Sequence, residues 1–96
     1  MPNKRSAAKR VRQSEKRRLR NKARKTAFKN AIKKLIKAME EGKTKDEIME
    51  LYRNVQALID KAEQKGAIHR NTAARKKSRV AARVRGYLES LEEKVS

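Results

Sequence analysis

Large aliphatic and aromatic residues are scarce in this chain, and they are concentrated in its last two thirds. Leu, Ile, Val and Phe account for 17 of the 96 residues, and only Val11 and Leu19 precede Phe28. With a net charge of +18, such a composition falls in the range associated with disorder. Because the apolar residues cluster after Phe28, the sequence predicts a small folded part that is preceded by a long basic arm.

Apolar residues recur with the period of an amphipathic helix in three successive segments. The three stripes are Phe28, Ala31, Ile32, Leu35, Ile36 and Met39; Ile48, Leu51, Tyr52, Val55, Leu58, Ile59 and Ala62; and Ala73, Val80, Ala81, Val84, Leu88 and Leu91. Gly42 and Gly66 are placed to end the first two helices. The pattern predicts helices over about 7–41, 45–65 and 70–92.

Capping residues support these boundaries. Ser6 is the expected cap of the first helix, and Thr44 with Glu47 forms a capping box before the second. His69 and Asn71 are both candidate caps of the third helix. Gly86 lies inside that helix, where a glycine costs about 1 kcal/mol.

The first helix is too long to be covered by the other two. At about 1.5 Å per residue it would span roughly 50 Å, against roughly 30 Å for each of the others. The predicted fold is therefore all-α, a three-helix bundle with an extended, basic first helix that projects beyond it. We assign residues 1–25 to a basic N-terminal arm and 26–96 to the bundle.

Charge is segregated along the chain. Residues 1–38 contain 16 basic and 1 acidic side chains, residues 67–88 contain 7 basic and none acidic, and the segment between them is nearly neutral. Two basic segments that flank a neutral one suggest a polyanionic partner that is contacted at two places.

The arm has nothing in the protein to pack against. Between Arg12 and Lys25 the only large apolar residue is Leu19, and basic residues repeat four positions apart and lie on all sides of a helix. Each such pair costs a few tenths of a kcal/mol, so we expect the arm to be disordered alone and helical on its partner. A solvated tail is the alternative. A membrane is disfavoured because interfacial helices need an apolar face, whereas nucleic acid offers phosphates that Arg binds well.

The third segment carries a basic row. Arg75, Arg79 and Arg83 repeat every four residues on the side opposite Val80 and Val84, with Lys76 beside them. We expect this row to act in binding more than in folding. His69 is the only histidine, so no metal site is predicted, and a capping or packing role is favoured over a phosphate or base contact. Tyr52 and Tyr87 could stack on bases, but their helical phase favours core and core-edge positions.

Several classes of function are excluded. No cysteine is present, and no nucleophile–base pair, phosphate-binding glycine loop or cluster of His and carboxylates appears, so neither an enzyme nor a bound cofactor is expected. The N-terminal MPNKRSAAKR lacks the apolar core of a signal peptide. No apolar run approaches the roughly 20 residues of a membrane span, so an intracellular protein is expected.

Two segments resemble a known family. SEKRRLRNKARK at 14–25 and GAIHRNTAARKKSR at 66–79 are similar to signature segments of the bacterial small-subunit ribosomal protein S20 family. The resemblance covers nearly the whole chain. It implies a three-helix bundle that binds 16S ribosomal RNA directly, as a monomer within the cytoplasmic ribosome. It further implies contacts with the rRNA 5′ domain and the long penultimate 3′ stem, and a role in rRNA folding and subunit assembly.

A nucleoid-type, non-specific DNA-binding protein is the remaining alternative. Such proteins usually dimerise or insert apolar wedges into the minor groove. This sequence shows neither a zipper for dimerisation nor an exposed apolar wedge. The candidate RNA-binding residues are Lys4, Arg5, Lys9, Arg10, Arg12, Lys16, Arg17, Arg18, Arg20, Asn21, Lys22, Arg24, Lys25, His69, Arg70, Asn71, Arg75, Lys76, Arg79 and Arg83.

Overall fold

Three α-helices account for nearly all of the described chain. The computed structural model describes the backbone of residues 4–95 and the side chains of residues 7–93. Helix α1 comprises Lys4–Glu40, α2 comprises Lys45–Gln64 and α3 comprises Arg70–Val95. The all-α prediction and the three predicted helices are confirmed. The molecule is elongated, with principal extents of 74 × 22 × 15 Å.

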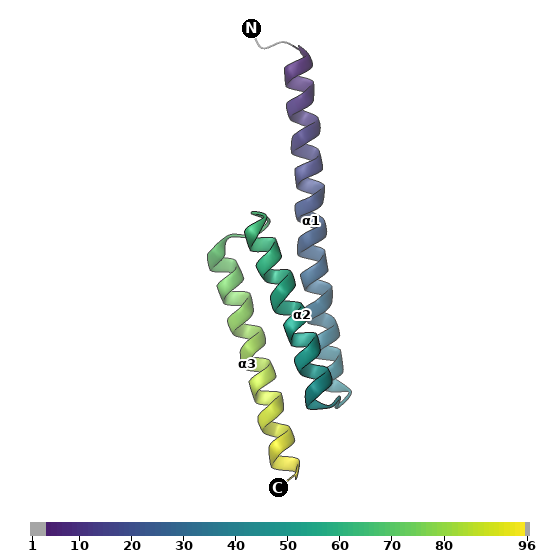
Figure 1. Cartoon of the computed structure of the whole chain (residues 1–96), viewed down its shortest axis with the longest axis vertical. Helices are drawn as coiled ribbons and strands as arrows, with labels where there is room; N and C mark the ends of the chain where they lie inside the picture. Colours follow the sequence, from purple (N-terminus) through teal and green to yellow (C-terminus); the bar gives the residue numbers. More distant parts are fainter. Residues whose placement is uncertain (1–3, 96) are drawn as a thin grey trace.

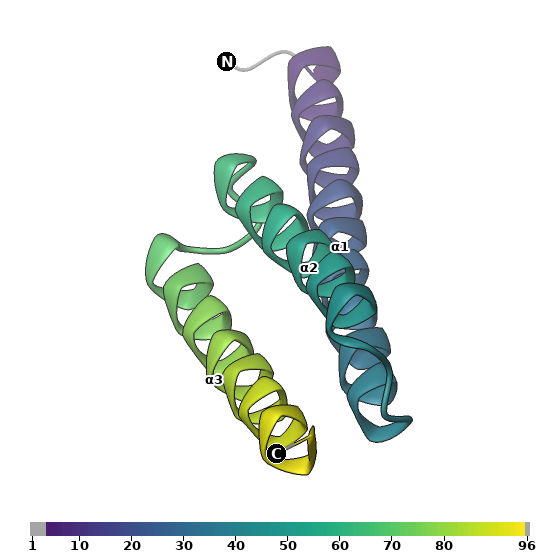
Figure 2. The same ribbon diagram turned by 60° about the horizontal axis from the view of Figure 1, so that its bottom comes forward.

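Helix α2 lies between the other two helices (Figures 1 and 2). It packs extensively against α1 and less extensively against α3, whereas direct contact between α1 and α3 is slight. The predicted bundle is therefore an open one. The N-terminal half of α1 extends alone beyond the turn that joins α2 to α3 (Figure 1).

The core is formed by the predicted stripes. The large side chains that are almost completely buried are Phe28 and Leu35 from α1 and Ile48, Val55 and Ile59 from α2. Helix α3 contributes Ala73, Val80 and Val84, and buried alanines fill the remaining positions, including Ala38 and Ala67, which the stripes did not include. Tyr52 and Tyr87 are half-buried against this core, as their phase predicted.

Gly42 and Gly66 end α1 and α2 by the same device. Both glycines have a positive φ, of 75° and 76°. After α1, the Lys43 amide donates to the Ala38 carbonyl at 3.1 Å, and after α2 the Ala67 amide donates to the Ala62 carbonyl at 2.8 Å. This is the Schellman arrangement, in which a left-handed residue lets the chain satisfy the last helical carbonyls.

The helix starts match the predicted caps only in part. The Thr44 hydroxyl accepts from the Glu47 amide at 3.4 Å, but the reciprocal bond of the capping box is absent among the described residues. Before α3, His69 Nδ1 accepts from the Asn71 amide at 3.1 Å, so His69 is the cap and Asn71 is not. The prediction of Ser6 as a cap is wrong, because α1 begins at Lys4 and Ser6 lies inside the helix.

Two polar contacts help to hold α3 in place. The Tyr87 hydroxyl donates to the Lys43 carbonyl in the α1–α2 turn at 2.6 Å. Lys77 forms an ion pair with Asp60 of α2, which raises the pKa of Lys77 above 10.5 by hydrogen bonding to the carboxylate. A lysine whose pKa is raised by folding stabilises the folded state fully at pH values below its unfolded pKa of 10.5. This stabilisation is lost only as the pH rises through the pKa of the folded state, so the ion pair is fully effective near pH 7. Both side chains are partly exposed, so the contribution is small.

Candidate nucleic-acid interface

We call residues 4–20 the overhang, because every described side chain in this part of α1 is exposed. Seven candidate cations lie within its described part, namely Lys9, Arg10, Arg12, Lys16, Arg17, Arg18 and Arg20. Lys22 and Lys25 extend the same basic surface. Lys4 and Arg5 belong to the first turn of α1, but their side chains lie outside the described residues.

The overhang joins the bundle at Asn21 and Arg24. Both side chains are half-buried, and Arg24 Nη1 donates to Asn21 Oδ1 at 3.2 Å. Arg24 also lines a groove between α1 and α2 with Leu58 and Lys61. These two candidates therefore lie where α1 first meets α2, and the cations that precede them project into solvent.

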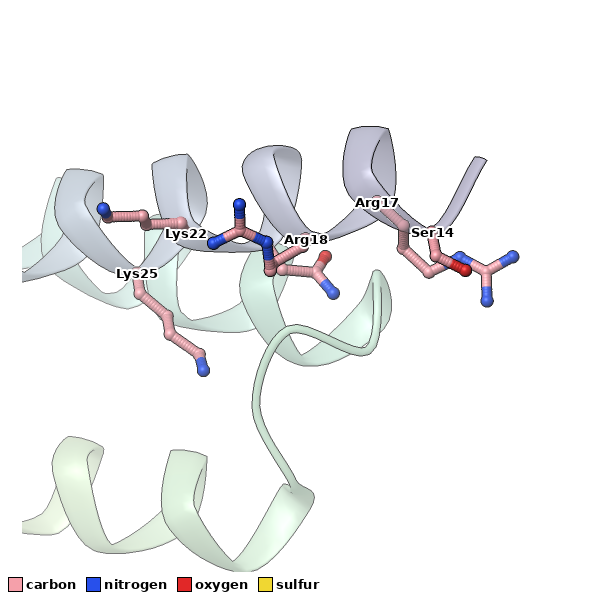
Figure 3. Close-up of a pocket in the computed structure, with 6 residues that line it drawn as sticks. Ser14, Arg17, Arg18, Lys22 and Lys25 are labelled. Atoms are coloured by element: carbon pink, nitrogen blue, oxygen red, sulfur yellow. The ribbon is translucent and has the colours of Figure 1, made fainter. Parts of the chain in front are cut away.

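One open depression on α1 brings several candidates together. It is lined by Ser14, Arg17, Arg18, Asn21, Lys22 and Lys25. In Figure 3 these side chains all come from α1, and Lys25 extends from it toward the side on which α2 and α3 lie. No ion pair joins a cation of residues 7–25 to a carboxylate within the described part of the chain. Cations gathered without a counter-charge favour an anionic ligand.

The basic row of α3 lies on its outer face. Arg75, Arg79 and Arg83 are exposed, whereas Val80 and Val84 are buried against α2. Arg70 and Asn71 at the start of the helix are also exposed, and Lys76 is half-buried. Lys77, by contrast, is committed to Asp60. The row thus has no visible role in packing.

His69 combines a structural role with an accessible ring. Its Nδ1 caps α3, so in the neutral imidazole the proton lies on Nε2. The side chain is exposed. The favoured capping role is therefore confirmed. Among the described residues Nε2–H has no hydrogen-bond acceptor, so it can donate to one on a ligand.

Three cations of α1 that were not among the candidates continue a row that begins at the candidate Lys25. Lys29, Lys33 and Lys37 follow it at four-residue spacing, and all four side chains are exposed. On α3, Arg85 is exposed as well. The four-residue spacing could have revealed the α1 row, because residues i and i+4 share one face of a helix. The basic surface of α1 therefore extends over the bundle as well as the overhang.

Acidic residues gather at the other end of the molecule. Glu40, Glu41, Asp46 and Glu47 surround the α1–α2 turn, and Glu89 and Glu92 lie near the end of α3. Figure 1 shows both places at the end remote from the overhang. A polyanion is attracted to the overhang and repelled from the opposite end, so the charge distribution orients an encounter.

Two further kinds of site were sought among the described residues, a metal-binding cluster and a membrane-spanning helix. They contain no group of three or more His, Cys, Asp or Glu side chains that could hold a metal ion. None of the helices, over the residues described, is both long enough and apolar enough to cross a membrane.

We predict that changing Arg75, Arg79 and Arg83 together to Gln weakens binding to rRNA with little change in thermal stability. Each side chain is exposed and pairs with no described carboxylate, so its charge is available to a phosphate. Filter binding and thermal melting followed by circular dichroism measure the two effects. A large fall in melting temperature would mean that the arginine stems cover the core.

Comparison with known proteins gives a consistent result over almost the entire chain. Residues 2–85 match the family described as Ribosomal protein S20. A protein of Thermotoga neapolitana named small ribosomal subunit protein bS20 is 62% identical over 92 residues, which cover 96% of this chain and 93% of that relative. Its namesake in Fervidobacterium nodosum is 58% identical over 88 residues, covering 92% and 93%. The chain belongs to the ribosomal protein S20 family.

Proposed function

We propose that this protein is a structural component of the small ribosomal subunit that binds 16S rRNA directly and supports rRNA folding and subunit assembly. Family membership and the names of the relatives support the assignment to the subunit. The observation that carries direct RNA binding is the overhang, a helix of exposed cations that have no carboxylate partner among the described residues. Such a helix is suited to a site lined by phosphates. The protein acts in the cytoplasmic ribosome.

The role is architectural. The S20 family consists of structural proteins of the ribosome, and the proposed binding requires neither a cofactor nor a reaction. The protein enters the subunit as a monomer whose α1 and α3 surfaces contact the RNA, and the candidate residues of both helices supply the contacts.

Two separate basic surfaces allow two separate RNA attachments. The overhang projects beyond the bundle, and helix α3, which carries the arginine row, lies on the far side of α2 from α1 (Figures 1 and 2). We assign these attachments to the 5′ domain of 16S rRNA and to its long penultimate 3′ stem. A protein that holds two distant RNA elements reduces the entropy cost of bringing them together, which is how it would promote rRNA folding.

The competing function is non-specific binding to nucleoid DNA, and no observation favours it. We expect the full-length protein to bind 16S rRNA at least about a hundredfold more tightly than duplex DNA, at equal salt and equal nucleotide concentration. Competition between labelled rRNA and unlabelled DNA measures the ratio. Equal affinity for the two would support the nucleoid function instead.

We expect the arm, residues 1 to about 25, to be disordered in the free protein and helical on rRNA; residues 1–3 of this range lie outside the described residues. Every described side chain of the overhang is exposed, and its like charges at i and i+4 oppose a helix in water. Without apolar burial, little offsets the backbone entropy of about 1–2 kcal/mol per ordered residue. Residue-resolved NMR of the free and bound protein tests this. Rigid order parameters through Arg12–Lys25 without RNA would refute coupled folding but not RNA binding.

A further inference from the structure

One face of the overhang does not suit phosphate. Val11, Glu15 and Leu19 are spaced four residues apart and therefore form a single row along α1. Val11 and Leu19 are 58% and 57% exposed, and they are the large apolar side chains that the described structure leaves exposed. Glu15 is also exposed, and it is the only acidic residue before Glu40. We call these three residues the neutral row.

The protein itself makes no use of Glu15. No ion pair or hydrogen bond of its carboxylate appears among the described residues, although basic residues surround it in sequence. An acidic side chain in a helix that binds a polyanion weakens that binding by repulsion unless it has a partner of its own. A hydrogen-bond donor on the ligand would remove this repulsion.

Cations border the neutral row on both sides. With 3.6 residues per turn, Arg12 and Lys16 lie about 100° round the helix from Val11 and Glu15 on one side of the row. Arg18 and Lys22 lie about 60° from Glu15 and Leu19 on the other side. All four basic side chains are exposed. The overhang and the turn of α1 that follows it thus present a narrow strip without positive charge between two positively charged edges.

A groove of double-stranded RNA has the complementary pattern, with two phosphate strands at its edges and uncharged groups between them. The major groove of A-form RNA is too deep and narrow for side chains to read. The minor groove is wide and shallow, and it displays ribose 2′-hydroxyls and base edges. A helix about 10–12 Å across can lie on such a surface.

We infer that the neutral row lies along the minor groove of a double-stranded segment of rRNA. Glu15 accepts hydrogen bonds there from ribose 2′-hydroxyl or base amino groups, and Val11 and Leu19 contact the ribose carbons. Arg12 and Lys16 bind phosphates of one strand, while Arg18 and Lys22 bind phosphates of the other. This inference rests on the proposed rRNA binding and specifies which part of the RNA the overhang contacts.

Changing Glu15 to Ala tests whether this carboxylate strengthens or weakens rRNA binding. If the overhang only neutralised phosphates, removing its one negative charge would tighten binding. We expect Glu15→Ala to bind 16S rRNA about tenfold more weakly, because a charge-assisted hydrogen bond is lost. Alanine is the best helix former, so a lower helix propensity does not explain a loss. Affinity equal to or tighter than that of the unchanged protein would overturn the inference.

Glu50→Ala is the matched control. Glu50 is an exposed carboxylate on α2, beside Glu47 and Leu51 in a groove remote from the overhang. The change alters net charge by the same amount as Glu15→Ala, and it should leave rRNA affinity unchanged or slightly tighter. If Glu15→Ala and Glu50→Ala weakened rRNA binding to the same extent, the loss would not be due to a contact of Glu15, and the inference would also be overturned.

A second variant tests the apolar part of the row. Val11→Ala with Leu19→Ala should weaken binding about tenfold while leaving the salt dependence unchanged, because apolar contacts release no counterions. If the neutral row faces a neighbouring protein instead, both row variants will bind isolated rRNA normally and fail only in subunit assembly, and the inference is then wrong. Should the unchanged protein show no preference for rRNA over DNA, the proposed function itself would fail.

Discussion

Raising the salt concentration from 50 to 200 mM is expected to weaken binding to 16S rRNA by about a thousandfold or more. Each phosphate that is neutralised releases condensed counterions, which contributes nearly one unit to the slope of log affinity against log salt. The described part of α1 up to Lys25 alone presents nine exposed candidate cations, none paired with a described carboxylate. If about six of the basic residues meet phosphates, the slope is roughly −5.

Equilibrium binding at five or more salt concentrations measures this slope directly. Replacing Arg17, Arg18 and Arg20 by Gln should make it shallower by about two to three units. Replacement of Glu50 by Ala is the control, because this exposed residue of α2 lies outside the basic surfaces. A slope shallower than about −2 for the unchanged protein would mean that most of the overhang stays in solvent.

Phe28→Ala is expected to destabilise the bundle by about 3–5 kcal/mol. Phe28 is 2% exposed and is the largest of the fully buried side chains. It lies where α1 enters the bundle, so its loss opens a cavity against α2 that alanine cannot fill. A bundle of this size has a total stability of only about 4–11 kcal/mol. The variant should therefore be partly unfolded at 37 °C.

Urea denaturation followed by circular dichroism measures this loss. Leu19→Ala is the matched control, because Leu19 is 57% exposed on the overhang and its truncation should change the free energy of unfolding by less than about 0.5 kcal/mol. A loss below about 1 kcal/mol for Phe28→Ala would indicate that the neighbouring alanines close around the vacated space.

Local sequence signals predicted the helices well. Gly42 and Gly66 ended α1 and α2 because only glycine adopts the left-handed conformation of that turn without strain. Ser6 was misread as a cap because a serine at the start of a basic segment is equally compatible with the interior of a longer helix. Buried Ala38 and Ala67 were missed, since alanine carries little information about burial by itself.

Helical periodicity predicted which face of a helix is buried but not which helices meet. It predicted that Arg75, Arg79 and Arg83 point outward, opposite Val80 and Val84, and this is confirmed. The pairing of Lys77 with Asp60 was not predicted, because it depends on which residues α2 and α3 bring together. The slight contact between α1 and α3 was not predicted for the same reason, as three amphipathic stripes are compatible with both closed and open packing.

The central position of α2 makes the two interfaces of the bundle energetically separable. Because α3 is attached almost only through α2 and the Tyr87 hydrogen bond to the α1–α2 turn, we expect it to detach at a lower cost than global unfolding, while the α1–α2 hairpin stays folded. Amide protons of α3 should then exchange with solvent before those of α2, which hydrogen exchange followed by NMR measures. A protein with a detachable last helix can anchor one RNA element first and search for the second while still tethered.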